Sequence, residues 1–125
     1  DAAFSQMARC LRDPHTGRAI DVWTVADSCT VTPRDRLDFM GYSIRVSEWR
    51  FTAWLPWDGP RLRADWSSVN STELYSHAGD SGVGPESLDS FEHENVAAKF
   101  PEVAAGLFQR LRGHFDDDAR DSYWV

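Results

Sequence analysis

The chain is 125 residues long, 42% of its residues are hydrophobic, 13% are aromatic, and its formal net charge at pH 7 is −7. This length and composition fit one globular domain, residues 1–125, with a core of its own, and they exclude a disordered chain. The acidic balance and the lack of zinc-finger, RNP and phosphate-loop patterns argue against nucleic acid as a partner, and no apolar run approaches the ~20 residues that a membrane span needs.

Residues 1–36 are expected to form a leading strand and a loop closed by a disulfide. Cys10 and Cys29 are the only two cysteines, and they enclose a stretch rich in turn formers. A bridge closing a loop of roughly 20 residues adds on the order of 3 kcal/mol of stability. Spacing alone leaves two buried free thiols as an equal alternative. Residues 21–25 are a weaker strand candidate within this loop.

The clearest pattern is a β-hairpin. Residues 40–47 and 49–55 alternate between apolar and polar side chains, which is the period of two of a half-buried strand. The turn is expected near Ser47-Glu48. Pro56 cannot donate to a ladder and turn formers follow it, so the second strand is expected to end there. The residues expected to anchor the core are Ile44, Trp49 and Phe51.

After the hairpin, residues 73–77 predict a short third strand. Apolar residues then recur at three- and four-residue steps after Pro101, which predicts an amphipathic helix of three to four turns with Gly113 as its stop signal. Residues 37–115 thus hold the hairpin, the third strand and the helix, and residues 116–125 are expected to be a solvated acidic tail. The predicted fold class is α+β: a small antiparallel sheet with a C-terminal amphipathic helix.

The residues that carry chemistry form no recognisable catalytic or metal pattern. The four histidines lack the spacing of a zinc site, so we expect them to be solvated or hydrogen-bonded. There is no nucleophile elbow, and the carboxylates do not single out a glycosidase pair. Asn70-Ser71-Thr72 is an N-glycosylation sequence. Together with the cysteine pair it indicates an oxidising, secretory-type compartment, and we predict the Cys10–Cys29 disulfide.

Several blocks, collinear over nearly the whole chain, resemble the C-terminal part of an iduronate-2-sulfatase-like sulfatase, a type I sulfatase of the alkaline-phosphatase-like superfamily. The block that runs from Met40 to Arg45 and on through Trp49–Trp54 is the most specific part. The blocks are Phe4-Ser5-Gln6 with Arg9-Cys10, Met40–Arg45, Trp49–Trp54 with Trp57-Asp58-Gly59, Glu73-Leu74-Tyr75 with His77 and Asp80, and Phe91-Glu92 with Asn95-Val96-Ala97.

The resemblance implies a C-terminal subdomain packed on the N-terminal catalytic domain of the same parent chain. Sulfatases of this kind hydrolyse sulfate esters with a formylglycine next to a calcium ion. Neither the formylglycine motif nor the calcium ligands occur in these residues. This portion is therefore expected to have a structural and cleft-lining role and not to be catalytic by itself. The implied substrate is a sulfated uronic acid or another glycosaminoglycan-type sugar. The implied location is the secretory pathway, the lysosome, the extracellular space or the periplasm.

The substrate-binding candidates are Arg45, Arg50 and Trp57, since the resemblance implies an anionic sugar in a cleft walled by this subdomain. Two roles stay open for Arg45: a clamp on a carboxylate or sulfate of the substrate, or an internal tie to a carboxylate at the subdomain interface. An alternative for the whole chain is a stand-alone carbohydrate-binding or interaction module, with Trp54, Trp57 and Trp66 as stacking platforms.

Overall fold

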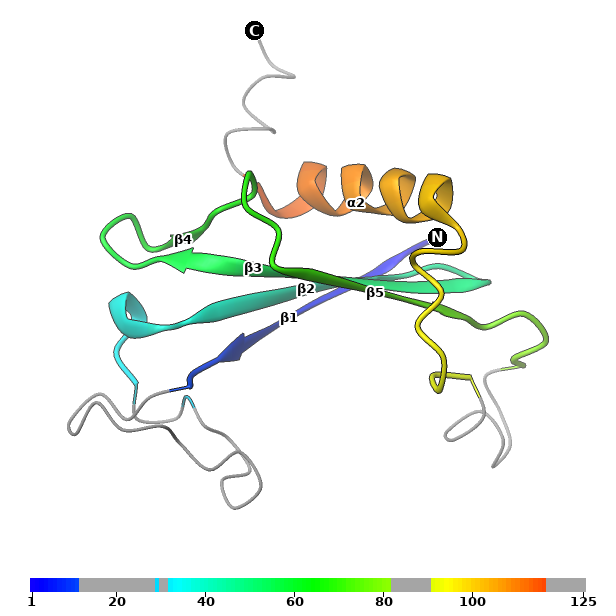
Figure 1. Ribbon diagram of the computed structural model, residues 1–125, viewed down its shortest axis with the longest axis horizontal. Helices are drawn as coiled ribbons and strands as arrows, with labels where there is room; N and C mark the ends of the chain where they lie inside the picture. Colours follow the sequence, from blue (N-terminus) through cyan, green and yellow to red (C-terminus); the bar gives the residue numbers. More distant parts are fainter. Residues whose placement is uncertain (12–28, 30–31, 82–90, 117–125) are drawn as a thin grey trace, which may run out of the picture.

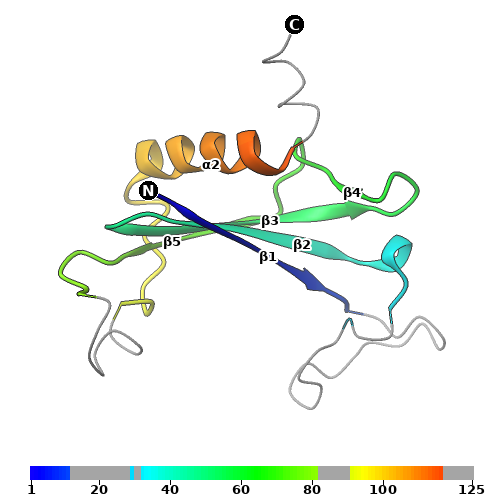
Figure 2. The same cartoon turned by 180° about the vertical axis from the view of Figure 1, so that it is seen from behind.

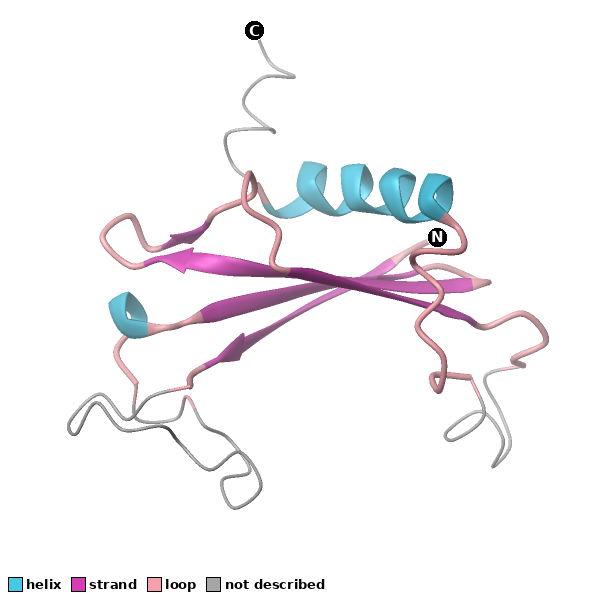
Figure 3. Ribbon diagram, in the orientation of Figure 1, coloured by secondary structure: helices cyan, strands magenta, loops and turns pink. Residues whose placement is uncertain are grey.

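The computed structural model describes residues 1–11, 29, 32–81 and 91–116. Those residues form an antiparallel five-stranded sheet with one α-helix lying along one of its faces (Figure 1; Figure 3), which confirms the predicted α+β class. None of the described helices is both long and apolar enough to cross a membrane. The elements are β1 (Ala3–Arg9), the 3₁₀ helix η1 (Arg34–Arg36), β2 (Phe39–Arg45), β3 (Trp49–Asp58), β4 (Arg63–Ala64), β5 (Ser71–Ser76) and α2 (Pro101–Phe115).

The hairpin of β2 and β3 forms the middle of the sheet, as the alternating pattern predicts. Arg45 lies opposite Arg50 in its register, and the N–H of Val46 donates to the oxygen of Trp49 at 2.9 Å to close the turn. On either side, β1 pairs with β2 and β5 pairs with β3. The leading strand and the third strand are therefore confirmed, although the third begins at Ser71, two residues earlier than expected. The strand candidate at residues 21–25 lies outside the described residues.

The prediction that β3 ends at Pro56 is wrong, because β3 continues to Asp58. The N–H of Trp57 donates to the backbone carbonyl of Asp38 on the β2 side (3.1 Å). The carbonyl of Pro56 accepts from the backbone N–H of Asp65 on the other side (2.9 Å). Since neighbouring residues of a strand point their polar groups to opposite edges, the missing N–H of Pro56 faces away from β2. The β2 ladder is thus complete past the proline, and the strand goes on to pair with β4.

The hydrophobic core lies between the sheet and α2. Ile44 is 0% and Phe51 1% exposed, and Leu107 and Leu111 of the helix are buried against the sheet residues. Full burial stabilises each such side chain by ~1.5–3 kcal/mol. Trp49, in contrast, is only half-buried. It packs at the edge of this core, and its ring centroid lies 5.2 Å from that of Phe100.

The end of the helix differs from the prediction in two ways. The helix passes Gly113 and ends at Phe115, whose ring centroid lies 4.5 Å from that of Tyr42 in the core. Asp116 is buried rather than solvated: its N–H donates to the Arg112 oxygen (2.8 Å), and its carboxylate accepts from the Arg112 Nε (2.9 Å). The packing of Phe115 and the hydrogen bonds of Asp116 at the helix C-terminus outweigh the tendency of Gly113 to end the helix. The rest of the expected tail, residues 117–125, lies outside the described residues.

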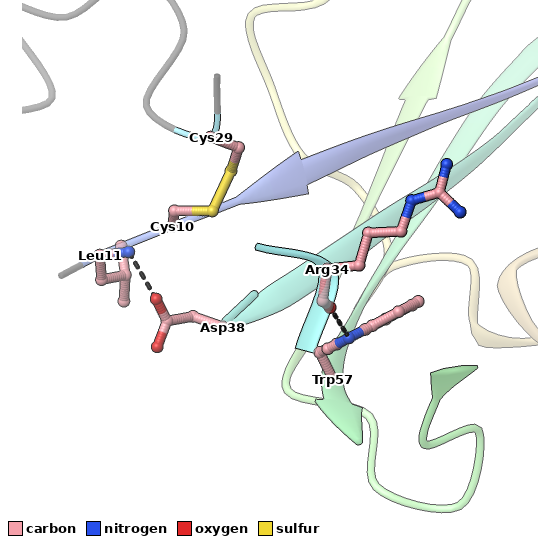
Figure 4. Close-up of a disulfide and its surroundings, with 6 residues drawn as sticks. All are labelled: Cys10, Leu11, Cys29, Arg34, Asp38 and Trp57. Carbon is pink, nitrogen blue, oxygen red and sulfur yellow. Dashed lines mark hydrogen bonds between the residues drawn. A yellow bond between two sulfur atoms is a disulfide. The ribbon is translucent and has the colours of Figure 1, made fainter. Parts of the chain in front are cut away.

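The predicted disulfide joins Cys10 to Cys29, with 5.4 Å between their Cα atoms, so neither cysteine is free (Figure 4). Cys10 is fully buried directly after β1. Beside it, the carboxylate of Asp38, just before β2, accepts a hydrogen bond from the N–H of Leu11 (2.6 Å). The bridge therefore ties the end of β1 to Cys29, and the Leu11–Asp38 hydrogen bond ties it to the start of β2. A disulfide is compatible with a secreted or extracellular protein.

Candidate functional site

The sheet face turned away from α2 carries a groove of about 340 Å³, lined by both polar and apolar atoms, which we call the far-face groove. Register places the hydroxyls of Ser5, Ser43 and Thr52 in one row across β1, β2 and β3, and Thr52 Oγ1 donates to Ser43 Oγ at 3.1 Å. Trp54 lies on one side of this row, and Arg50 lies on the other. The groove thus has a floor with a row of hydroxyls, an aromatic wall at Trp54 and, opposite it, a wall where Arg50 is paired with Glu92.

At the cationic end of the groove lies a cluster of five ionisable side chains, which we call the charged cluster: Arg45, Arg50, His77, Asp80 and Glu92. The Nη2 of Arg45 lies 3.6 Å from Asp80 Oδ2, and its Nη1 donates to the oxygens of Val46 and Ser47. Arg45 is therefore tied to a carboxylate of this same chain and to the turn of the hairpin. The ion pair lies within this chain and involves no carboxylate of another domain.

His77 is the centre of the charged cluster and is only 5% exposed. Its Nδ1 lies 2.8 Å from Asp80 Oδ2, its Nε2 lies 3.6 Å from Glu92 Oε2, and its ring stacks on Phe91. The carboxylate of Asp80 is thus held between an arginine and a histidine. Gly79, at φ +85°, makes the turn that brings Asp80 back to His77, and a side chain there would be strained.

Arg50 differs from Arg45 because much of its side chain stays accessible. It forms an ion pair with Glu92 (Nε to Oε1, 3.5 Å), and 43% of its side-chain surface is exposed. Its Nε is buried and has no hydrogen-bond partner among the described residues. Since a guanidinium offers several donors in a planar fork, Arg50 is the cation of the cluster that can contact an anion entering the far-face groove.

Glu73 accepts two short hydrogen bonds on the floor of the groove. The Nε1 of Trp54 donates to its Oε2 and the hydroxyl of Tyr75 donates to its Oε1, both at 2.6 Å. The hydrogen bond to Glu73, with burial and nearby negative charge, raises the pKa of Tyr75 to about 12. Trp54 also lies against Gly41, where a Cβ would come within 2.6 Å of its ring, and the Arg9 guanidinium sits 5.4 Å from its ring centroid.

The three tryptophans predicted as stacking platforms lie in different surroundings. Trp54 is held as just described, and Trp66 is 8% exposed and stacked on Tyr42. Trp57 donates its Nε1 hydrogen to the carbonyl of Arg34 (2.7 Å; Figure 4). It lies seven residues after Arg50 along β3, roughly 20 Å away at the rise of a strand. The structure thus brings Arg45 and Arg50 together and leaves Trp57 outside the site.

A second cavity, of about 400 Å³, lies beside the C-terminal end of α2. Its arginines include Arg61, 3.7 Å from Asp58, and Arg112, which pairs with Asp116. Burial and the Asp116 charge raise the pKa of Tyr42 in its wall. Arginines of both cavities are paired with carboxylates, and the far-face groove is preferred because Arg50, predicted as a substrate-binding residue, lines it. Within the described parts of the chain, no three His, Cys, Asp or Glu side chains are grouped to hold a metal ion.

No protein-family model and no curated protein matches this sequence. The geometry also contains residues that sequence reasoning did not single out as a site. His77, Asp80 and Glu92 belong to the blocks of the resemblance, but the sequence assigns them no role. The spacing His77-x-x-Asp80 with a glycine between them was the signal available, since it is that of a hydrogen-bonded turn.

Proposed function

We propose that this chain is the C-terminal portion of an iduronate-2-sulfatase-like sulfatase, which hydrolyses sulfate esters of a sulfated uronic acid or glycosaminoglycan-type sugar. One observation supports the proposal above the others. Motif residues that are distant in sequence converge on one cluster beside one groove: Arg45 and Arg50 come from the most specific block, and His77, Asp80 and Glu92 come from the later ones.

In this proposal Arg50 contacts a sulfate or carboxylate of the substrate from the wall of the cleft, and Arg45 positions the cluster through Asp80. The partner of the far face is the N-terminal catalytic domain of the same parent chain. That domain would supply the formylglycine and the calcium ion for sulfate-ester hydrolysis, and the described residues offer no group of ligands for a metal ion. The chain by itself is therefore not expected to turn over sulfate esters.

The proposed location is the secretory pathway, the lysosome, the extracellular space or the periplasm. The Cys10–Cys29 disulfide supports an oxidising compartment. Asn70 is exposed at the start of β5, where a glycan has room. In protein from its native source, an endoglycosidase should lower the mass of the wild type and leave that of Asn70→Gln unchanged.

The experiment that tests the function begins with the reading frame upstream of Asp1. We expect it to encode a C-x-(P/A)-S-R motif. In the purified parent enzyme, Arg50→Gln should raise the Michaelis constant for a sulfated disaccharide more than for a small aryl sulfate, with Arg50→Lys intermediate. An upstream frame without such a motif, or turnover by the isolated chain, would contradict the proposal. Equal Michaelis constants for wild type and Arg50→Gln would contradict only the role given to Arg50 and not the proposed function.

A further inference from the structure

The two long edges of the sheet are treated differently by the fold. At the β5 edge, the amide of Asn95 accepts from the N–H of Leu74 and donates to the carbonyl of Thr72, both at 3.0 Å. The N–H of Val96 then donates to the Leu74 oxygen at 2.8 Å. The polar groups that β5 turns outward are therefore satisfied by the segment that leads to α2.

At the β1 edge, the ladder determines which residues face outward. The N–H of Val46 donates to Trp49, so the even-numbered residues of β2 bond to β3 and the odd-numbered ones bond to β1. Their partners in β1 are the odd-numbered residues from Ala3 to Arg9. Since β1 is an outer strand of the sheet (Figure 2), Phe4, Gln6 and Ala8 turn their N–H and C=O groups away from the sheet, and no backbone partner for these groups occurs among the described residues.

The β1 strand also lacks the features that usually protect an edge. Its seven residues pair without a bulge, contain no proline, and carry one charge, Arg9, at the end. The side chains of Gln6 and Met7 are exposed, Met7 by 54%. This edge is thus a regular template on which another strand can add.

We propose that β1 pairs antiparallel with β1 of a second copy of this chain, about a two-fold axis through Gln6. In that register Gln6 faces Gln6, and each bulky side chain faces a small one. Phe4 lies opposite Ala8 of the second copy, and Met7 lies opposite Ser5. Arg9 lies opposite Ala3, so no like charges meet. A two-fold interface needs this self-complementarity, which an arbitrary strand from another protein would not provide.

The arrangement makes one continuous sheet through both copies, with the two α2 helices on the same face. Phe4 already packs on that face against the ring of His114, at 3.9 Å. The pairing uses only the outward backbone groups, so it leaves the hairpin, the charged cluster and the core of each copy unchanged. It does not depend on the sulfatase proposal.

The test compares Gln6→Pro with Gln6→Val by sedimentation velocity over a concentration series. Proline removes the outward N–H of an exposed edge residue without touching the β2 ladder, whereas valine keeps that N–H. By symmetry two hydrogen bonds are lost per dimer, so Gln6→Pro should weaken dimerisation on the order of thirtyfold, with Gln6→Val close to wild type. Met7→Lys should weaken it as well, since it places two like charges diagonally across the axis.

Amide hydrogen exchange identifies the surface used. The amides of Phe4, Gln6 and Ala8 should exchange more slowly as concentration rises, whereas that of Leu74, already bonded to Asn95, should not change. A monomer at all concentrations overturns the proposal, as does a dimer that Gln6→Pro leaves intact. Protection of these three amides in a monomer also overturns it, because the edge would then be covered by the chain itself.

Discussion

Replacing Arg45 by glutamine should destabilise the fold strongly, although the residue lies on the surface of the sheet. Arg45 is 27% exposed, and its Asp80 partner, 3.6 Å away, is 5% exposed. Two unit charges at this separation attract by about 4–5 kcal/mol at an effective dielectric constant of ~20. The cost of desolvating the two charges offsets part of this attraction. Removing Arg45 leaves the buried carboxylate of Asp80 with one cation fewer, so we expect the free energy of unfolding to fall by ~2–4 kcal/mol.

The neighbouring Arg50→Gln is the matched control, since Arg50 lies opposite Arg45 on the same face and also loses an ion pair. Both Arg50 and Glu92 are about 40% exposed, and such pairs contribute ~0–1 kcal/mol. At about 4 °C per kcal/mol, Arg45→Gln should lower the melting temperature by roughly 8–16 °C and Arg50→Gln by at most about 4 °C. Urea unfolding followed by tryptophan fluorescence gives the free energies directly. Equal losses for the two variants would refute the reasoning that burial of Asp80 decides the cost.

Replacing both half-cystines by serine should lower the free energy of unfolding by about 3 kcal/mol, and a reductant should do the same to the wild type but nothing to the variant. In a spectrophotometric titration Tyr75 should ionise near pH 12 and, in Glu73→Gln, nearer pH 10. Because the pKa of Tyr75 is raised in the folded state, the stability that this hydrogen bond contributes is fully present below pH ~10 and is lost as the pH rises through ~12. Urea unfolding at a series of pH values should show this loss in the wild type and not in Glu73→Gln. Gly41→Ala should cost ~1–3 kcal/mol because its Cβ meets the Trp54 ring, and a Trp54→Ala background should remove most of that cost.

Much of the sheet was predictable because its side chains alternate strictly. Ile44 and Phe51 follow that alternation, and the structure buries both against α2. The extension of β3 beyond Pro56 was not predictable, since a proline keeps a ladder intact only where its nitrogen faces away from the paired strand, and pairing decides which side that is. The helix passes the local stop signal at Gly113 for a related reason, because the contact of Phe115 with Tyr42 comes from the core.

The site was predictable only in part. The alternation places Arg45 and Arg50 on one face, and their register makes them neighbours, whereas Trp57 shares the strand but not the site. The acids that pair with them could not be chosen from the sequence, because Asp80 and Glu92 reach the cluster from segments after β5. Only the folded path of those segments brings the two carboxylates to the arginines.

The Cys10–Cys29 bridge also has a consequence for the oxidation of the chain. The bridge joins Cys10, directly after β1, to Cys29, and in the folded chain the Cα atoms of the two residues lie 5.4 Å apart. Thermodynamic reciprocity requires that the ~3 kcal/mol by which the bridge favours folding is also the amount by which folding favours the bridge. The effective concentration of one thiol at the other is therefore about a hundredfold higher in the folded chain than in the unfolded chain. A thiol–disulfide buffer that leaves the unfolded chain mostly reduced can still hold the folded chain oxidised.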